Sequence, residues 1–417
     1  MELKRVVITG IGAITPLGNT LDEFWTNLVD GVSGADMITQ FDASKFRTRF
    51  ACEVKNFDPT NYLDRKEARK IDRFTQFALV ASDQAMADAG LNKDNINPDR
   101  IGVVVASGIG GLITFQNEVV DFAKGDGTPR FNPFFIPKMI LDIAAGQISM
   151  RHNLRGPNFA VVSACASSTN AIIQACDLLR LGKADIILSG GSEAVISQAG
   201  VGGFNAMKAM SERNDDPKTA SRPYDKDRDG FIMGEGSGIV VLETLEHALA
   251  RGAKIYCEVA GGGATADAYH ITAPHPDGLG AKNVMLRALE DAGMVPEDID
   301  YINTHGTSTP LGDLAEAKAI VSVFGEHAYN LNISATKSMT GHCLGAAGAI
   351  EAIACIKAIV HDIIPPTINH FTDDPELDSR LNFTFNKAQK RVVYAALSNT
   401  FGFGGHNACV IVKKYKG

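Results

Sequence analysis

The sequence predicts an α/β protein made of two similar halves. Cys165, in VVSACASSTNAIIQA, and His342, in SATKSMTGHCLGAAGAIEA, each lie at the start of a predicted helix of small residues. The segment VVITGIGAITPLG near the start of the chain resembles YCEVAGGGATADA further along. Such internal similarity favours a duplicated strand–helix unit. Helices that are apolar nearly all round must be buried between layers.

The first half begins with a predicted strand in RVVITG, with no apolar signal region before it. A basic run follows in YLDRKEARKIDRF, against a net charge of −8 for the whole chain. Most charge runs are solvated surfaces, but one that opposes the mean charge also suits the docking of an acidic partner. The overall acidity argues against general nucleic-acid binding.

Cys165 is the first candidate nucleophile. A strand is predicted to end at Val161 and Val162, and a helix to run from Ala164 to Leu179. Unpaired N–H groups at a helix start favour an anion, so the pKa of the Cys165 thiol is expected to fall toward neutrality. The alternative is a buried structural cysteine, the expectation for Cys176 and Cys355 within apolar helical runs.

The loop-rich span 202–236 is predicted to cap the site, and the halves are predicted to join near RGAKIYCEVAG. We therefore divide the chain into 1–254 and 255–417. In the second half, His305 ends a short strand in YINTHGTSTPLGD, and His342 opens a second helix. Laying Cys165 on Cys343 aligns the two helices. Because ligands gather at the carboxyl ends of strands in open α/β sheets, one cysteine and two histidines are expected at one rim.

Four motifs in this order, ACASS, NTHGTSTPLGD, ATKSMTGHCLGAAG and SNTFGFGGHNA, resemble the β-ketoacyl-[acyl-carrier-protein] synthases of the thiolase fold. The resemblance covers essentially the whole chain. It implies a five-layered αβαβα architecture, a homodimer and a decarboxylating Claisen condensation that lengthens an acyl chain by two carbons. The expected partner is an acyl carrier protein bearing acyl and malonyl thioesters.

The resemblance also implies roles for individual residues. Cys165 matches the nucleophile, and His305 and His342 match the pair that stabilises the enolate left by decarboxylation. Lys337 matches an essential lysine. The N–H groups of Cys165 and Phe403 match an oxyanion hole, and Phe403 also matches a gate over the thiol.

Further positions match pocket, docking and cation sites. Ile109, in a GIGG segment similar to that of type II elongating synthases, matches a wall of the neighbouring subunit's acyl pocket; the alternative is an ordinary strand-to-loop isoleucine. Other expected pocket residues are Thr307, Thr309 and Phe401. Carrier-protein docking is assigned to Lys66, Arg69, Lys70, Arg130 and Lys208. No cofactor is expected to be required, but the family implies a structural monovalent or divalent cation at Asn303, Thr304, Glu351, Ser398 and Asn399. A hydrogen-bond network without metal is the alternative.

Composition agrees with this interpretation. The chain has 417 residues, 45% of them hydrophobic, and no apolar run of the roughly 20 residues that span a membrane. Seven cysteines without paired spacing favour a reducing compartment, so we expect a cytoplasmic protein. Three alternatives remain: a degradative thiolase, a condensing enzyme of a specialised polyketide or aryl-lipid pathway, and a non-catalytic subunit that shapes a chain-length pocket. The acyl-length preference and the division of proton transfers are not fixed by the sequence.

Overall fold

The computed structural model describes residues 3–92 and 96–417 and contains a ten-stranded sheet to which both halves contribute five strands. The first half supplies β1 (Val6–Ile14), β4 (Ile101–Ala106), β5 (Asn158–Phe159), β6 (Ile186–Glu193) and β7 (Gly236–Thr244). The second half supplies β8 (Cys257–Ala266), β9 (Tyr301–Asn303), β10 (Asn332–Ser334), β13 (Ala395–Gly402) and β14 (His406–Lys413). The pairs β2 (Asp36–Met37) with β3 (Phe50–Ala51) and β11 (Ile363–Ile364) with β12 (Gln389–Lys390) lie outside it.

The two halves share one topology. The spatial order is β5-β4-β6-β7-β1 in the first and β10-β9-β13-β14-β8 in the second, so each half arranges its strands third, second, fourth, fifth, first. In both halves the second strand pairs in parallel with the third and the fourth, and the fifth strand pairs antiparallel with the fourth and the first. The first strands, β1 and β8, join the halves through an antiparallel ladder from Val6↔Val259 to Ile8↔Cys257. This confirms the predicted duplication.

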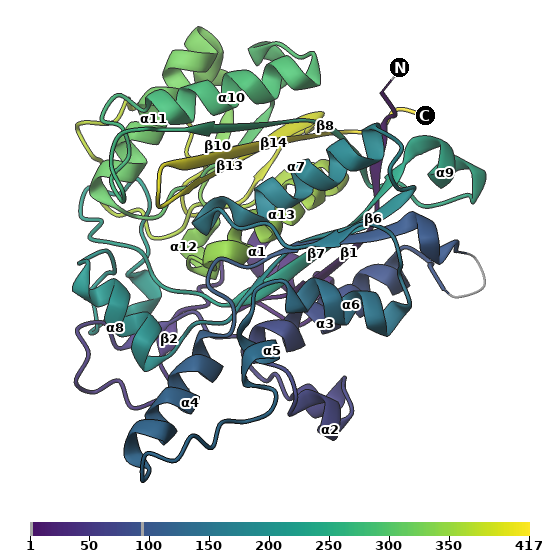
Figure 1. The fold of residues 1–417 in the computed structure, drawn as a ribbon. Coiled ribbons are helices and arrows are strands. Elements are labelled where there is room, and N and C mark those ends of the chain that lie inside the picture. Colours follow the sequence, from purple (N-terminus) through teal and green to yellow (C-terminus); the bar gives the residue numbers. More distant parts are fainter. Residues whose placement is uncertain (1–2, 93–95) are drawn as a thin grey trace.

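Helices make the other three layers (Figure 1). The central layer is α7 (Ser167–Arg180) with α13 (Ala347–His361), which pack between the two parts of the sheet. The first outer layer holds α3 (Arg73–Asp88) and α6 (Ile143–His152), and the second holds α10 (Leu279–Ala292) and α11 (Pro310–Phe324). The result is the expected αβαβα order.

The remaining helices lie at the edges of these layers or beside the site. They are α1 (Leu21–Val29), α2 (Arg65–Ala68), α4 (Leu112–Lys124), α5 (Phe135–Met139), α8 (Gln198–Ala206), α9 (Leu245–Ala250) and α12 (Lys337–Thr340), with 3₁₀ turns η1 (Pro59–Asn61), η2 (Pro98–Arg100), η3 (Ala164–Ala166), η4 (Pro217–Thr219), η5 (Pro296–Asp298), η6 (Gly325–Asn330) and η7 (Leu344–Ala346).

Glycines show how closely the outer helices approach the first strands. A Cβ at Gly12 would lie 1.9 Å from the carbonyl oxygen of Ala81 in α3, and one at Gly263 would lie 2.5 Å from that of Val284 in α10. No side chain fits at such distances, so both strands need glycine where the helix crosses them. The similarity between VVITGIGAITPLG and YCEVAGGGATADA thus marks equivalent strands.

The segment Leu344–His361 is long and apolar enough to cross a membrane, but 89% of it is buried inside the protein. The helix α13 lies beside α7 between the two parts of the sheet (Figure 1). This position explains its composition, because a helix covered on every side has no face for polar residues.

Three local expectations were wrong. Val161 and Val162 do not end a strand, because the nearest strand, β5, ends at Phe159 and Val162 is 56% exposed. His342 does not open the second helix, which begins five residues later at Ala347 after η7. Laying Cys165 on Cys343 is off by two residues: η3 and η7 each precede a central helix, so the position equivalent to Cys165 is Gly345.

The predicted boundary between residues 254 and 255 falls in the segment between α9 and β8. The division into halves at that point stays a prediction.

Candidate active site

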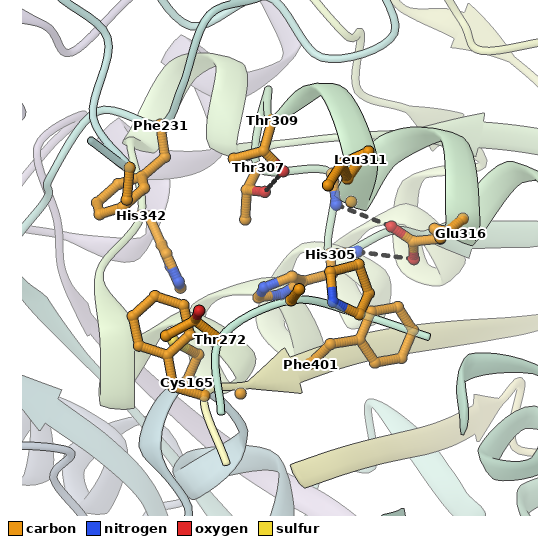
Figure 2. Close-up of a pocket in the computed structure, with 18 of the residues that line it drawn as sticks. Cys165, Phe231, Thr272, His305, Thr307, Thr309, Leu311, Glu316, His342 and Phe401 are labelled. Atoms are coloured by element: carbon orange, nitrogen blue, oxygen red, sulfur yellow. Dashed lines mark hydrogen bonds between the residues drawn. The ribbon is translucent and has the colours of Figure 1, made fainter. Parts of the chain in front are cut away.

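Cys165 lies in the middle of η3, one turn before α7, at the bottom of a cavity of about 440 Å³ (Figure 2). The preceding residue, Ala164, has φ +51°, in the left-handed region that L-residues rarely adopt. This sharp turn aims the thiol into the cavity. The equivalent residue of the second half, Leu344, has φ +46°, so the turn is part of the repeated unit.

Both predicted histidines face the same cavity. His305 follows the end of β9, and His342 lies between α12 and η7. Their ring centroids are 5.2 Å apart and the rings are nearly perpendicular, at 87°. The Nδ1 atom of each ring is buried without a hydrogen-bond partner. Two imidazoles and one thiol therefore converge on one space, as the sequence predicted.

Burial and a buried cation keep both imidazoles neutral. Loss of solvent is the largest cause that lowers the pKa of His305 and of His342 well below the usual value, and the charge of Lys337 lowers both further. Lys337, in α12, is 1% exposed and donates a hydrogen bond to Glu351 of α13. Neutral imidazoles can each donate one N–H to a substrate oxygen.

The pKa of the Cys165 thiol is higher than expected from the sequence. Burial raises the pKa of Cys165 to about 11, whereas Lys337 and the N–H of Phe403 act in the opposite direction and the carboxylate of Glu193 raises it further. The sequence indicated the helix start correctly, but it did not reveal how completely the thiol is removed from water. Desolvation of a thiolate outweighs the favourable charges around it.

The expected oxyanion hole has a supporting contact. Phe403 follows Gly402, the last residue of β13, and the N–H of Phe403 is close enough to the Cys165 sulfur to favour its anion. A Cβ at Gly402 would lie 3.1 Å from the Cys165 nitrogen. Glycine at position 402 therefore leaves the space over the Cys165 N–H open.

The other expected pocket residues divide into two groups. Thr307, Thr309 and Phe401 line the cavity; the two threonine hydroxyls are 3.0 Å apart, and the Phe401 ring lies 5.5 Å from that of His305. Ile109 does not line this chain's cavity and is 36% exposed. Its assignment to a neighbouring subunit's pocket stays a prediction.

The span 202–236 lines the cavity, although it is less irregular than expected because α8 includes its first residues. Phe204, from α8, and Phe231 contribute aromatic rings, and Phe231 packs edge-on against His342 at 5.5 Å. Neither ring was singled out from the sequence. Their spacing carries no signal, because loop residues reach a site through tertiary folding alone.

Glu316 was also missed. Its carboxylate, on α11, accepts hydrogen bonds of 2.9 Å from the backbone nitrogens of His305 and Gly306 (Figure 2). Burial raises the pKa of Glu316 to about 7, and those two N–H groups act against the rise. The signal available in the sequence was an acidic residue three positions after Asp313 in a largely apolar helix.

The predicted cation ligands do not all share one face. Ser398 pairs with Asn303 in the β13–β9 ladder, and the Ser398 Oγ and the Glu351 Oε2 are buried without partners. Asn399 points to the opposite face, where its amide donates to Glu316, because successive strand residues alternate. The Thr304 hydroxyl donates to the Ser334 carbonyl. The side chains of Asn303 and Ser398 thus share a face of the sheet, and Glu351 lies on α13, which packs against β13 and β9.

The predicted docking residues are all exposed, but they lie in separate places. Lys66, Arg69 and Lys70 lie on or beside α2, Arg130 lies between α4 and α5, and Lys208 is at the cavity mouth after α8. Figure 1 shows α2 and α8 well apart. Arg73, from the same basic run, is instead paired with the fully buried Glu235 at 2.7 Å.

Comparisons with known proteins show which family this chain resembles. Residues 3–248 match the model of the β-ketoacyl synthase N-terminal domain, and residues 256–371 match that of the C-terminal domain. The 3-oxoacyl-[acyl-carrier-protein] synthase 2 of Synechocystis sp. is 51% identical over 416 residues, which cover 100% of this chain and 99% of that protein.

Solved structures are similar over the same length. The ishigamide ketosynthase/chain length factor has a TM-score of 0.92 at 36% identity, with 99% of this chain and 100% of that chain covered. A type II polyketide ketosynthase in complex with its acyl-carrier protein has a TM-score of 0.90 at 33% identity and the same coverage. The chain therefore belongs to the β-ketoacyl synthase family.

Proposed function

We propose that this protein condenses an acyl-[acyl-carrier-protein] with malonyl-[acyl-carrier-protein] to give 3-oxoacyl-[acyl-carrier-protein] and carbon dioxide in fatty acid elongation. The convergence of Cys165, His305 and His342 on one cavity carries this proposal, and full-length similarity to a 3-oxoacyl-[acyl-carrier-protein] synthase 2 supports the substrate class.

In the first half-reaction, Cys165 attacks the acyl thioester. The sulfur–carbon bond forms as the thiol loses its proton, because a thiol with a pKa of about 11 is neutral at pH 7. The N–H groups of Cys165 and Phe403 stabilise the tetrahedral oxyanion, and the carrier thiol leaves with a proton. The acyl chain then remains on Cys165.

In the second half-reaction, His305 and His342 donate N–H groups to the malonyl thioester oxygen. The bond between the α-carbon and the terminal carboxylate breaks, and carbon dioxide leaves. The electron pair of that bond stays with the α-carbon and generates the enolate. The α-carbon attacks the acyl carbon, and the Cys165 sulfur departs and takes up a proton. Lys337 stabilises negative charge at the site without contacting the thiol through a hydrogen bond.

The partner is an acyl carrier protein. A ketosynthase of similar structure is known in complex with its acyl-carrier protein, which supports this class of partner. Docking on the exposed basic residues near α2 and at the cavity mouth would use electrostatic complementarity to an acidic carrier.

We also propose a homodimer in the cytoplasm. Exposed apolar side chains gather on α4, on α5, in the loop between them and on the edge strand β5: Phe115, Val119, Phe122, Phe131, Phe134, Ile136 and Phe159. A second copy would cover this surface and the open edge of β5. Pairing of subunits would also bring docking residues that are far apart in one chain closer to those of the other.

A structural cation fits part of the predicted site. Carboxylate, amide and hydroxyl oxygens are the ligands that hard cations prefer. Three oxygens of the predicted set, Glu351 Oε2, Ser398 Oγ and Asn399 Oδ1, have no hydrogen-bond partner, and the first two lie away from the face to which Asn399 points. Asn303, on the face of Ser398, would complete the set with those two. A bound cation would add positive charge beside the ion pair of Lys337 and Glu351.

A specialised polyketide pathway is the second candidate, because one of the solved structures described above is a type II polyketide ketosynthase. The higher identity to the Synechocystis enzyme favours fatty acid elongation. The presence of Cys165 and both histidines opposes a non-catalytic subunit.

Intact-protein mass spectrometry after incubation with acyl carrier proteins of several chain lengths tests the proposal. The wild type should gain one acyl group, and Cys165→Ala should gain none. Cys176→Ala is the matched control, since Cys176 is buried in α7 away from the cavity. Acylation of the Cys165→Ala variant would contradict the mechanism.

A further inference from the structure

Glu193 is the last residue of β6 and is fully buried, yet the reaction described above does not use it. Its carboxylate accepts five hydrogen bonds. Three come from the backbone nitrogens of Gly108 (2.7 Å), Ile109 (3.2 Å) and Gly110 (3.2 Å). The others come from the Ser107 hydroxyl (2.8 Å) and the Gly345 nitrogen (3.0 Å).

All five partners are donors, so the ionised form of Glu193 fits this environment. A protonated carboxyl would present an O–H where four of the five partners are backbone N–H groups that cannot accept it, and only the Ser107 hydroxyl could. Burial is the main cause that raises the pKa of Glu193, and the same hydrogen bonds oppose the rise. The group is therefore a buried anion held by surrounding N–H and O–H groups.

The carboxylate connects two segments from different halves. One is the loop 107–110, which carries Ile109. The other is η7, whose residues Leu344 and Gly345 follow His342; Leu344 lines the cavity and packs with Cys165. These segments touch, because a Cβ at Gly345 would lie 2.2 Å from the Gly108 nitrogen.

The internal repeat explains this place for an anion. Gly345 is equivalent to Cys165, and Glu193 is equivalent to Gly402, since each is the last residue of the fourth strand and pairs with the fifth. At the catalytic turn, Gly402 of the second half leaves the N–H of Cys165 of the first half free for a substrate oxyanion. At the equivalent turn, the N–H of Gly345 of the second half is occupied by Glu193 of the first half.

We propose that Glu193 is a positioning residue that holds the loop 107–110 and η7 in one arrangement, and so sets which acyl chain lengths the enzyme accepts. The chain-length part rests on the proposed function and on the role of Ile109. The effect of the Glu193 charge on the thiol does not.

Glu193→Gln tests this. The amide keeps the shape but places an NH₂ group against backbone N–H donors, so the loop should lose its fixed position. Acylation with long chains should fall about tenfold relative to short chains, equivalent to ~1.4 kcal/mol. An unchanged chain-length profile would overturn the proposal.

Alkylation of Cys165 by iodoacetamide gives an independent measurement. The charges that act on the thiol are Lys337, from α12, and Glu193, from β6, beside the two imidazoles of the cavity. Removing the anion should make alkylation faster at pH 8. An unchanged rate would show that no anion lies beside the thiol and would also overturn the proposal.

Glu243→Gln is the matched control, because Glu243 is equally buried but binds Arg251 and Thr9 away from the cavity. It should leave both measurements unchanged. If Glu193→Gln does not fold, Ser107→Ala removes one of the five hydrogen bonds and keeps the charge. It should shift the chain-length profile by a smaller amount, and no shift would refute the positioning role. Should the wild type form no acyl-enzyme at all, the proposed function fails, while alkylation still tests Glu193.

Discussion

A single methyl group at position 402 should stop acyl transfer. A Cβ built on Gly402 lies 3.1 Å from the Cys165 nitrogen and 2.7 Å from the Ser163 carbonyl oxygen. Gly402→Ala would therefore shield an N–H that the oxyanion needs and push on the turn that carries the thiol. Loss of one such donor lowers the rate by about 10²–10³-fold.

Single-turnover acylation, followed by intact mass, measures this rate. One added methyl in a packed site costs about 1–3 kcal/mol of folding free energy, so thermal unfolding should still show a folded variant. Gly146→Ala is the control, because no atom lies within 4 Å of a Cβ at that position in α6. An acylation rate within about threefold of wild type, less than ~1 kcal/mol in the barrier, would refute the assignment of this N–H.

Four other predictions concern the same site and its partner. His305→Ala should accept an acyl group but lose about 2.7–4 kcal/mol of enolate stabilisation, seen as slower release of carbon dioxide from malonyl carrier; unchanged release would exclude that role. Because the thiolate is the nucleophile and the pKa of Cys165 is about 11, alkylation of the resting enzyme should accelerate about tenfold per pH unit between pH 7 and 10. A plateau near pH 7 would contradict the effect of burial. Ile109→Phe should shorten the accepted chains through a packing cost of about 1–3 kcal/mol, measured as acylation rate against acyl length, and coincident profiles would make Ile109 an ordinary residue. Replacing Lys66, Arg69 and Lys70 by Glu should raise the KM for carrier-linked substrates but not for small thioesters, and the effect should be smaller at high salt. Equal defects with both substrates would indicate damage to the fold instead.

The sequence predicted the duplicated architecture and the three reactive side chains because each leaves a local signal. Small residues mark the central helices, and glycines in β1 and β8 mark the strands that outer helices cross. Cys165 and His342 lie beside these patterns.

The register of the repeat was not predictable to the residue. The similarity of the two helix starts suggested Cys343 as the counterpart of Cys165, whereas the left-handed residues Ala164 and Leu344 show that it is Gly345. Backbone conformation, not residue type, is what the two turns share.

Environment was harder still to predict. The pKa of Cys165 depends on how much water surrounds the thiol, and the rings of Phe204 and Phe231, which pack in one cluster with Cys165, are brought there by tertiary folding. Glu193 and Glu316 act mainly through backbone N–H groups, so most of their partners have no side-chain signature in the sequence.

The packing of α7 against α13 has a consequence for synthesis. The ribosome completes α7 at Arg180 but does not complete α13 until His361, and at 5–20 residues per second this takes roughly 10–40 s. During that time the apolar side of α7 is not yet covered by α13, and the edge of β1 that later pairs with β8 is not yet paired. The nascent first half therefore exposes a surface suited to chaperone binding, and slower translation of the second half should increase aggregation more than slower translation of the first.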